Sequence, residues 1–266
     1  FRMQFRNILI IVLSLSLFSC GHIESKPTDI LPRTSFLHIR KTLTVMKCED
    51  NQCMSRDFNS AASGFVVKVV KDGAYAITAA HVCEDNVPPE LESPPTKPSA
   101  TYVMRRWDGA SYKAAVLTYD REIDVCLVFV KDLTEGVEPV KISPTKPEPG
   151  DRVYNIASPI AIFRPNMVPI LEGRYSGETE GLAWYFLPAA PGSSGSMIVN
   201  EDGELVGLVH SVFIRFPVIT LSTRYDHLLS FIKTNLDKYI VYKRVMNRLG
   251  LDNIFEPDSF TPDKTS

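Results

Sequence analysis

Short apolar runs alternate with polar turns over most of the chain, a pattern typical of β-strands rather than helices. The segments SGFVVKVV (63–70) and AYAITAA (74–80) are two such runs, and the KDG between them predicts a hairpin. A second hairpin is expected over 101–120, turning at WDGA. Further strands are expected in the second half, at 151–158, 168–177, 181–189, 195–200, 205–216 and 218–222.

The period of the pattern changes near the C-terminus. Leu228, Ile232, Leu236 and Ile240 recur every four residues, which predicts an amphipathic helix over 223–246, followed by a tail over 247–266. The proline-rich segment SPTKPEPG (143–150) interrupts the strands and predicts a linker between two sets of strands, 36–142 and 151–222. Many short strands in two sets favour an all-β fold built from barrels or sandwiches.

The N-terminal segment MQFRNILIIVLSLSLFSC (3–20) has a basic start followed by an apolar run from Ile8 to Phe18. That run is too short to span a bilayer comfortably and has the length of a signal-peptide core. The closing LFSC resembles a bacterial lipobox, in which Cys20 would become lipidated and tether the protein to a membrane. We expect a signal over 1–20, a tether over 21–35, and export as a periplasmic or outer-membrane lipoprotein, or alternatively as a secreted protein.

Four further cysteines would then enter an oxidising compartment, where disulfides form. They are Cys48, Cys53, Cys83 and Cys126, for which three connectivities exist. Cys48 and Cys53 flank the polar turn EDNQ, which favours their pairing and leaves Cys83 with Cys126; buried free thiols are the alternative. The chain has no CxxC or HExxH motif, so no metal site or cofactor is expected. Its net charge of −2 gives no reason to expect a nucleic-acid partner.

The segment GSSGS (192–196) is either a solvated turn or a nucleophile loop. A serine nucleophile needs a histidine base, a carboxylate that orients the histidine, and backbone N–H donors for the oxyanion. Flanking glycines allow such a turn, and the frame set by Gly192 and Gly195 selects Ser194. His81 follows a strand and two alanines, and Asp124 begins a very apolar strand; a structural histidine and a surface turn are the alternatives.

Together these three motifs resemble the trypsin-like (chymotrypsin-fold) serine peptidases. The motifs TAAHV (78–82), DVCLV (124–128) and GSSGS (192–196) stand in the order of that family, and the likeness extends over roughly 40–240. YDREIDVCLV (119–128) and PGDRVYNIASP (149–159) also look like the bacterial branch that includes the high-temperature-requirement proteases. The resemblance implies two six-stranded antiparallel β-barrels with a C-terminal α-helix, and a monomer acting on a protein or peptide substrate.

The resemblance also implies roles for individual residues. Ser194 would be the nucleophile, His81 the general base and acid, and Asp124 the orienting carboxylate, with an oxyanion hole formed by the backbone N–H groups of Gly192 and Ser194. The candidate wall of the S1 pocket consists of Leu187, Ala189, His210 and Val212. His210 would line that pocket, hydrogen-bond near Asp124, or simply fill space. The alternatives to a serine endopeptidase are a catalytically silent peptide-binding module on the same fold and an esterase-like hydrolase.

Overall fold

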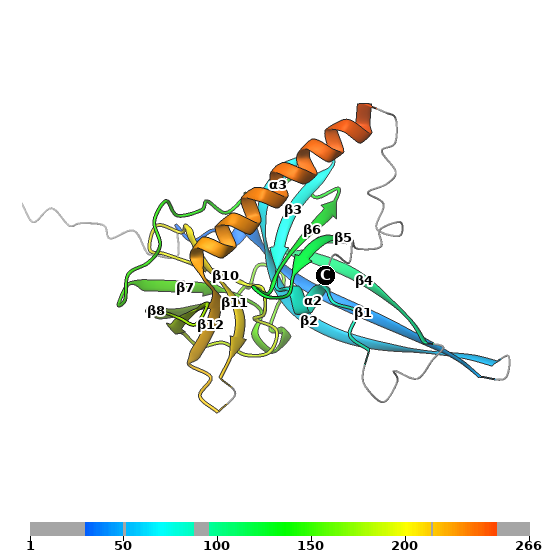
Figure 1. Cartoon of the computed structure of the whole chain (residues 1–266), viewed down its shortest axis with the longest axis horizontal. Coiled ribbons are helices and arrows are strands. Elements are labelled where there is room, and N and C mark those ends of the chain that lie inside the picture. Colours follow the sequence, from blue (N-terminus) through cyan, green and yellow to red (C-terminus); the bar gives the residue numbers. More distant parts are fainter. Residues whose placement is uncertain (1–29, 50–51, 88–95, 214, 249–266) are drawn as a thin grey trace, which may run out of the picture. The chain divides into compact units, whose positions relative to one another are not determined.

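The computed structural model describes residues 30–49, 52–87, 96–213 and 215–248, which form two closed antiparallel β-barrels and a C-terminal helix (Figure 1). The first barrel has the strand order β1-β2-β3-β6-β5-β4 and the second the order β10-β11-β12-β9-β8-β7. The strands of the first barrel are β1 (Phe36–Glu49), β2 (Gln52–Val70), β3 (Gly73–Thr78), β4 (Thr96–Arg106), β5 (Ser111–Asp120) and β6 (Val125–Lys131). Those of the second barrel are β7 (Arg152–Ile156), β8 (Ile170–Thr179), β9 (Leu182–Phe186), β10 (Met197–Val199), β11 (Leu205–Val212) and β12 (Ile219–Thr223). The expected fold of two six-stranded barrels and a terminal helix is therefore confirmed.

Both predicted hairpins of the first barrel are present, with β2 pairing to β3 and β4 pairing to β5. The hairpin of β1 and β2 is much longer than the short strands expected there, since its register runs from the pair Phe36 and Phe65 to the pair Glu49 and Gln52. Figure 1 shows β1 and β2 extending together beyond the barrel, with β4 beside β1. The distal part of β2, residues 52–60, is mostly exposed, so no apolar run marks it in the sequence.

The C-terminal helix α3 (Tyr225–Arg248) forms where the sequence predicted a helix over 223–246, and both of its ends lie two residues later. Its stripe faces the core, because Leu228 and Ile232 are buried and Leu236 and Ile240 pack against the buried cluster. The Tyr239 hydroxyl fixes the helix to the first barrel by donating a 2.6 Å hydrogen bond to the Leu117 carbonyl. The helix thus closes one side of the core that the two barrels share.

Three short elements connect these strands. The 3-10 helix η2 (Arg33–Ser35) precedes β1, the single helical turn α2 (Ala80–Cys83) follows β3, and the 3-10 turn η4 (Pro159–Ala161) follows β7. The predicted signal, most of the tether, the lipidation site Cys20 and most of the tail lie outside the described residues. None of the described helices has the length and apolarity that crossing a bilayer requires.

Candidate active site

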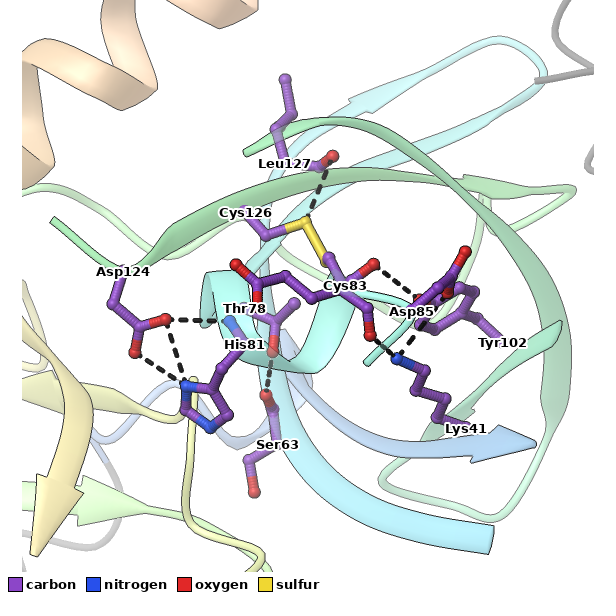
Figure 2. Close-up of a disulfide and its surroundings, with 11 residues drawn as sticks. Lys41, Ser63, Thr78, His81, Cys83, Asp85, Tyr102, Asp124, Cys126 and Leu127 are labelled. Carbon is purple, nitrogen blue, oxygen red and sulfur yellow. Dashed lines mark hydrogen bonds and ion pairs between the residues drawn. A yellow bond between two sulfur atoms is a disulfide. The ribbon is translucent and has the colours of Figure 1, made fainter. Parts of the chain in front are cut away.

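His81 and Asp124 meet on the first barrel as a histidine–carboxylate pair (Figure 2). The His81 ring Nδ1 lies 2.9 Å from Asp124 Oδ2, and the His81 backbone N–H donates to Oδ1 over 2.9 Å. The carboxylate is buried while the imidazole is about half exposed. Because a carboxylate only accepts hydrogen bonds, this contact places the proton of the neutral ring on Nδ1 and leaves Nε2 free to accept a proton.

The local backbone explains how each partner reaches the other. His81 projects from the single turn α2, directly after the buried Ala79 and Ala80, whose small side chains let the turn lie against the barrel. Asp124 adopts a positive φ of 53° at the end of the turn that precedes β6. Asp120 shapes that turn, since its Oδ1 accepts hydrogen bonds from the N–H groups of Glu122 and Ile123.

A disulfide joins Cys83 to Cys126, one of the pairings considered from the sequence (Figure 2). Each cysteine stands two positions after a member of the histidine–carboxylate pair. The bond therefore fastens α2 to the start of β6 beside that pair. Cys48 stands opposite Cys53 in the β1–β2 register, where the polar turn was expected to bring them together, but the side chain of Cys48 lies outside the described residues.

Of the three clustered serines, Ser194 is the one whose side chain is not buried. Ser193 and Ser196 are both 0% exposed, whereas Ser194 is partly exposed. Ser193 Oγ accepts from the Ala190 N–H, and Ser196 Oγ accepts from the Asn155 amide over 2.6 Å. The hydroxyl groups of Ser193 and Ser196 thus form hydrogen bonds that stabilise the loop.

Ser194 and His81 line the same cavity, of about 320 Å³, which lies between the β1–β2 hairpin and α2. Within the described part of the chain no hydrogen bond joins the two side chains. Such contacts are often long in ligand-free sites and tighten when substrate binds. The other lining residues come from these same elements and the segment after them: Lys41, Leu43, Phe58, Asn59, Ser60, Ala61, Ala62, Val82, Glu84 and Asn86.

The peptide groups of the loop have a defined orientation. The Pro191 carbonyl accepts a 2.6 Å hydrogen bond from the Ile160 N–H, and the Ser193 carbonyl accepts a 2.9 Å bond from the Ser196 N–H. Because C=O and N–H of a trans peptide point in opposite directions, these bonds turn the N–H groups of Gly192 and Ser194 the other way. Neither N–H donates to any acceptor among the described residues.

Two glycines make this loop geometry sterically feasible. Gly192 and Gly195 both have positive φ, of 100° and 78°. A Cβ at Gly195 would lie 2.2 Å from Thr78 Oγ1, and one at Gly192 would lie 2.6 Å from the Ser158 carbonyl oxygen. The loop backbone therefore lies so close to its neighbours that only glycine fits at these two positions.

A buried polar chain, which the sequence analysis missed, links this loop to the first barrel. Ser63 Oγ donates to the Gly192 carbonyl over 2.8 Å and accepts from the Ser158 N–H over 3.0 Å. Ser158 Oγ in turn lies 2.9 Å from His38 Nδ1, and the His38 ring stacks on Phe163. Burial, the largest cause, together with Arg105 and Arg40 lowers the pKa of His38 to about 4. His38 and Ser158 are 120 residues apart, so no local pattern could have revealed their contact.

The residues expected to line an S1 pocket fall into two groups. Leu187 and Ala189 are buried in the core of the second barrel, and Val212 packs against that core. His210 instead contacts the active-site carboxylate, with Nε2 lying 3.4 Å from Asp124 Oδ2. Of the three roles considered for His210, the structure supports a place near Asp124, where the two side chains lie at ion-pair distance. Burial is the main cause that lowers the pKa of His210, opposed by Asp124 and reinforced by His81.

No group of three or more His, Cys, Asp and Glu side chains suited to a metal ion occurs within the described ranges. The chemistry that the site can perform with its own residues is nucleophilic attack by a serine hydroxyl, assisted by a histidine base and by the two unpaired N–H groups.

Comparisons with known proteins agree with the fold that carries this site. The family model described as a trypsin-like peptidase domain matches residues 62–208, which include His81, Asp124 and Ser194. Among solved structures, the chain is similar to an HtrA-type protease, AlgW, in a serine-to-alanine variant with a decapeptide. That match has 15% identity and a TM-score of 0.62, and it covers 80% of this chain and 67% of the other. Comparison with curated protein sequences finds no match.

Proposed function

Since the chain belongs to the trypsin-like peptidase family, we propose that it is a serine endopeptidase acting on protein or peptide substrates. The observation that carries the proposal is the placement of His81 and Ser194 at one cavity, with His81 bonded to a buried carboxylate. The N–H groups of Gly192 and Ser194, which meet no acceptor among the described residues, support it independently.

The reaction follows from these groups. Ser194 Oγ attacks the carbonyl carbon of the scissile bond while His81 Nε2 takes the hydroxyl proton. The negative oxygen of the tetrahedral intermediate accepts hydrogen bonds from the N–H groups of Gly192 and Ser194. Collapse of the intermediate breaks the C–N bond, and His81 returns the proton to the leaving amine. Water then attacks the acyl-enzyme by the same route and frees Ser194.

Asp124 fixes the ring of His81 and stabilises its imidazolium form through the 2.9 Å contact at Nδ1. Each oxyanion donor typically contributes about 10²–10³ in turnover, because it is already oriented before the charge develops. In this chain that orientation comes from the two carbonyl anchors opposite the donors, on Pro191 and Ser193.

A fluorescent fluorophosphonate, which reacts with activated serines, tests the proposal on the full chain. We expect labelling of the wild type and of the exposed control Ser111→Ala, and none of Ser194→Ala or His81→Ala. Retained labelling of Ser193→Ala would identify which serine reacts. Failure to label folded wild type would contradict the proposal and favour a silent peptide-binding module, whereas labelling with cleavage of small esters but not of casein would indicate an esterase.

We also propose that the protein works outside the cytoplasm, tethered through Cys20. The Cys83–Cys126 disulfide supports an oxidising compartment, since such bonds are rare in reducing ones. Fractionation of the source cells together with mass spectrometry of the mature N-terminus tests this proposal. A diacylated Cys20 at the N-terminus is expected, and an intact 1–20 segment in the cytoplasm would contradict it.

A further inference from the structure

A second cavity lies where the β2–β3 hairpin meets the C-terminal half of α3 (Figure 1). Its volume is about 420 Å³, against about 320 Å³ for the cavity that contains Ser194 and His81. It borders the beginning of β3, whereas His81 follows the end of that strand, whose six residues span roughly 20 Å. We call it the basic cavity after its polar lining residues, Lys71, Asp72, Tyr75, Lys243, Arg244 and Arg248.

Positive charge dominates the lining of the basic cavity. Four lining side chains are cations and one is a carboxylate, a net charge of +3 in a chain whose overall net charge is −2. Arg244 and Arg248 stand four positions apart on α3, where like charges repel each other. The C-terminal end of a helix favours cations, but Lys71 comes from the β2–β3 hairpin and gains nothing from that effect. The cavity is therefore suited to attract an anion.

The carboxylate of the cavity does not neutralise the cations at its rim. Asp72 forms an ion pair with Lys243, whose Nζ also lies 3.8 Å from the centre of the Phe129 ring. Lys243 is buried, whereas Lys71, Arg244 and Arg248 are exposed. Among the described residues, no carboxylate pairs with these three exposed cations. Their charge is thus available to a ligand.

The hydroxyl of Tyr75 is a second, independent sign of a missing ligand. Tyr75 is 0% exposed and packs edge-on against Phe129, yet its hydroxyl has no hydrogen-bond partner within the described ranges. Leaving a buried hydroxyl unpaired is costly, and such groups normally have a partner. Burial, the larger cause, and Asp72 raise the pKa of Tyr75 to about 12, so the phenol keeps its proton and can donate it to an acceptor. An anion in the basic cavity would supply that acceptor.

A phosphate group matches these donors better than a single carboxylate does. Its terminal oxygens accept charge-assisted hydrogen bonds from lysine and arginine, and a phosphomonoester carries a charge of about −1.5 to −2 at neutral pH. The volume of the cavity lies in the range of pockets for small organic ligands, and Val70 and Ile240 give its wall an apolar part. The ligand can therefore have a carbon portion as well as the phosphate.

We propose that the basic cavity binds the phosphate group of a phosphomonoester. Lys71, Arg244 and Arg248 contact the phosphate oxygens, and the Tyr75 hydroxyl donates a hydrogen bond to one of them. The same chemistry is offered by a soluble organic phosphate and by the headgroup of a lipid such as phosphatidic acid. This site does not depend on the proposed peptidase function.

Calorimetric titration of the full chain with glycerol 3-phosphate at low salt tests the proposal. The double variant Lys71→Gln/Arg244→Gln removes two cations of the rim, and we expect its affinity to fall about ten-fold or more, because each lost hydrogen bond is charge-assisted. The control Lys113→Gln/Lys233→Gln removes the same charge from exposed lysines outside the cavity and should keep wild-type affinity. Urea midpoints establish that both double variants are folded.

Tyr75→Phe tests the hydroxyl separately, since it keeps the ring against Phe129. We expect the affinity for glycerol 3-phosphate to fall about ten-fold. The urea midpoint without ligand should not fall, because the hydroxyl has no protein partner to lose within the described residues. A lower midpoint without ligand, combined with unchanged affinity, would overturn the assignment of this hydroxyl to the ligand.

Vesicles of phosphatidylcholine with and without phosphatidic acid distinguish the two sources of the phosphate. Saturable binding of glycerol 3-phosphate that is lost in Lys71→Gln/Arg244→Gln would support the proposal with a soluble ligand. Co-sedimentation with phosphatidic acid vesicles alone, lost in the same variant, would support it with a lipid headgroup. Failure of wild type to bind either probe, or equal weakening in Lys113→Gln/Lys233→Gln, would overturn it.

Discussion

Removing the Cys83–Cys126 disulfide should cost a large part of the stability of this protein. The bond joins residues 43 positions apart, and for a loop of that length the chain-entropy model gives about 4 kcal/mol of stabilisation at 25 °C. Domains typically have only about 5–15 kcal/mol in total. Because Cys83 and Cys126 follow His81 and Asp124 by two positions, a looser attachment of α2 to β6 should also disturb the histidine–carboxylate pair.

The measurement compares wild type with the double variant Cys83→Ala/Cys126→Ala by urea denaturation under oxidising conditions. The midpoint should fall by the equivalent of about 4 kcal/mol, and the rate of fluorophosphonate labelling should fall with it. Both sulfur atoms are buried, so truncation also removes packing. Reduced wild type, which retains the side chains, separates that contribution from the cross-link. A double variant with the midpoint of oxidised wild type would refute the reasoning.

Three further changes test other parts of the site. Burial lowers the pKa of His38 in the folded protein to about 4, whereas an exposed histidine in the unfolded chain has a pKa of 6.5. The unfolded chain therefore binds more protons between these pH values, and the unfolding free energy should fall by about 3 kcal/mol from pH 6.5 to pH 4. Urea midpoints across that range check this, and an equally steep slope in His38→Phe would contradict it. Gly195→Ala should abolish labelling, because its Cβ would overlap the barrel wall at 2.2–2.6 Å, while Gly150→Ala, also at positive φ but with nothing within 4 Å, should retain it. Ser63→Ala should lower the unfolding free energy by about 1–3 kcal/mol and slow labelling, because it leaves the Gly192 carbonyl without its donor; equal midpoints for the variant and wild type would argue against that role.

The three residues that meet at the candidate site could be singled out from the sequence because each carries a local signal. His81 follows a buried strand and two alanines, and Asp124 enters a very apolar strand where an unpaired charge would be costly. Ser194 stands between glycines whose positive φ the loop requires. The turn that delivers Asp124 also has a local cause, because the Asp120 side chain accepts a hydrogen bond from the N–H group of Glu122 two residues later.

The supporting contacts could not be predicted, because their partners lie far apart in the chain. Ser63 meets Gly192 across 129 positions and Ser158 across 95, and each serine alone looks like an ordinary small polar residue. The length of the β1–β2 hairpin could not be predicted for a different reason. The outer residues of β2, 52–60, are mostly exposed, so they lack the alternation that marks a half-buried strand.

His210 shows the limit of reading a role from an approximate position. Its place within the expected strand 205–216 allowed a pocket wall, a contact with Asp124 or a space-filling role, and a shift of one residue along a strand turns a side chain to the opposite face. The direction of the His210 side chain depends on the pairing of β11 with β12, whose register is interrupted between Val209 and Ser211. The irregularity lies at His210 itself, which no pattern of residue types encodes.

The contacts of the nucleophile loop explain why the site requires both barrels at once. The Ser194 carbonyl accepts from the Ser63 N–H over 3.0 Å, and the Gly192 carbonyl accepts from the Ser63 hydroxyl, so one residue of the first barrel holds the loop on both sides of Ser193. Conversely, His210 of the second barrel contacts Asp124 of the first barrel. A shift between the barrels would therefore disturb the oxyanion donors and the carboxylate together. Substitutions of residues that join the two barrels, such as Ser63, should therefore lower both the catalytic rate and the unfolding free energy. Substitutions on the sides of the barrels that face away from each other should lower only the unfolding free energy.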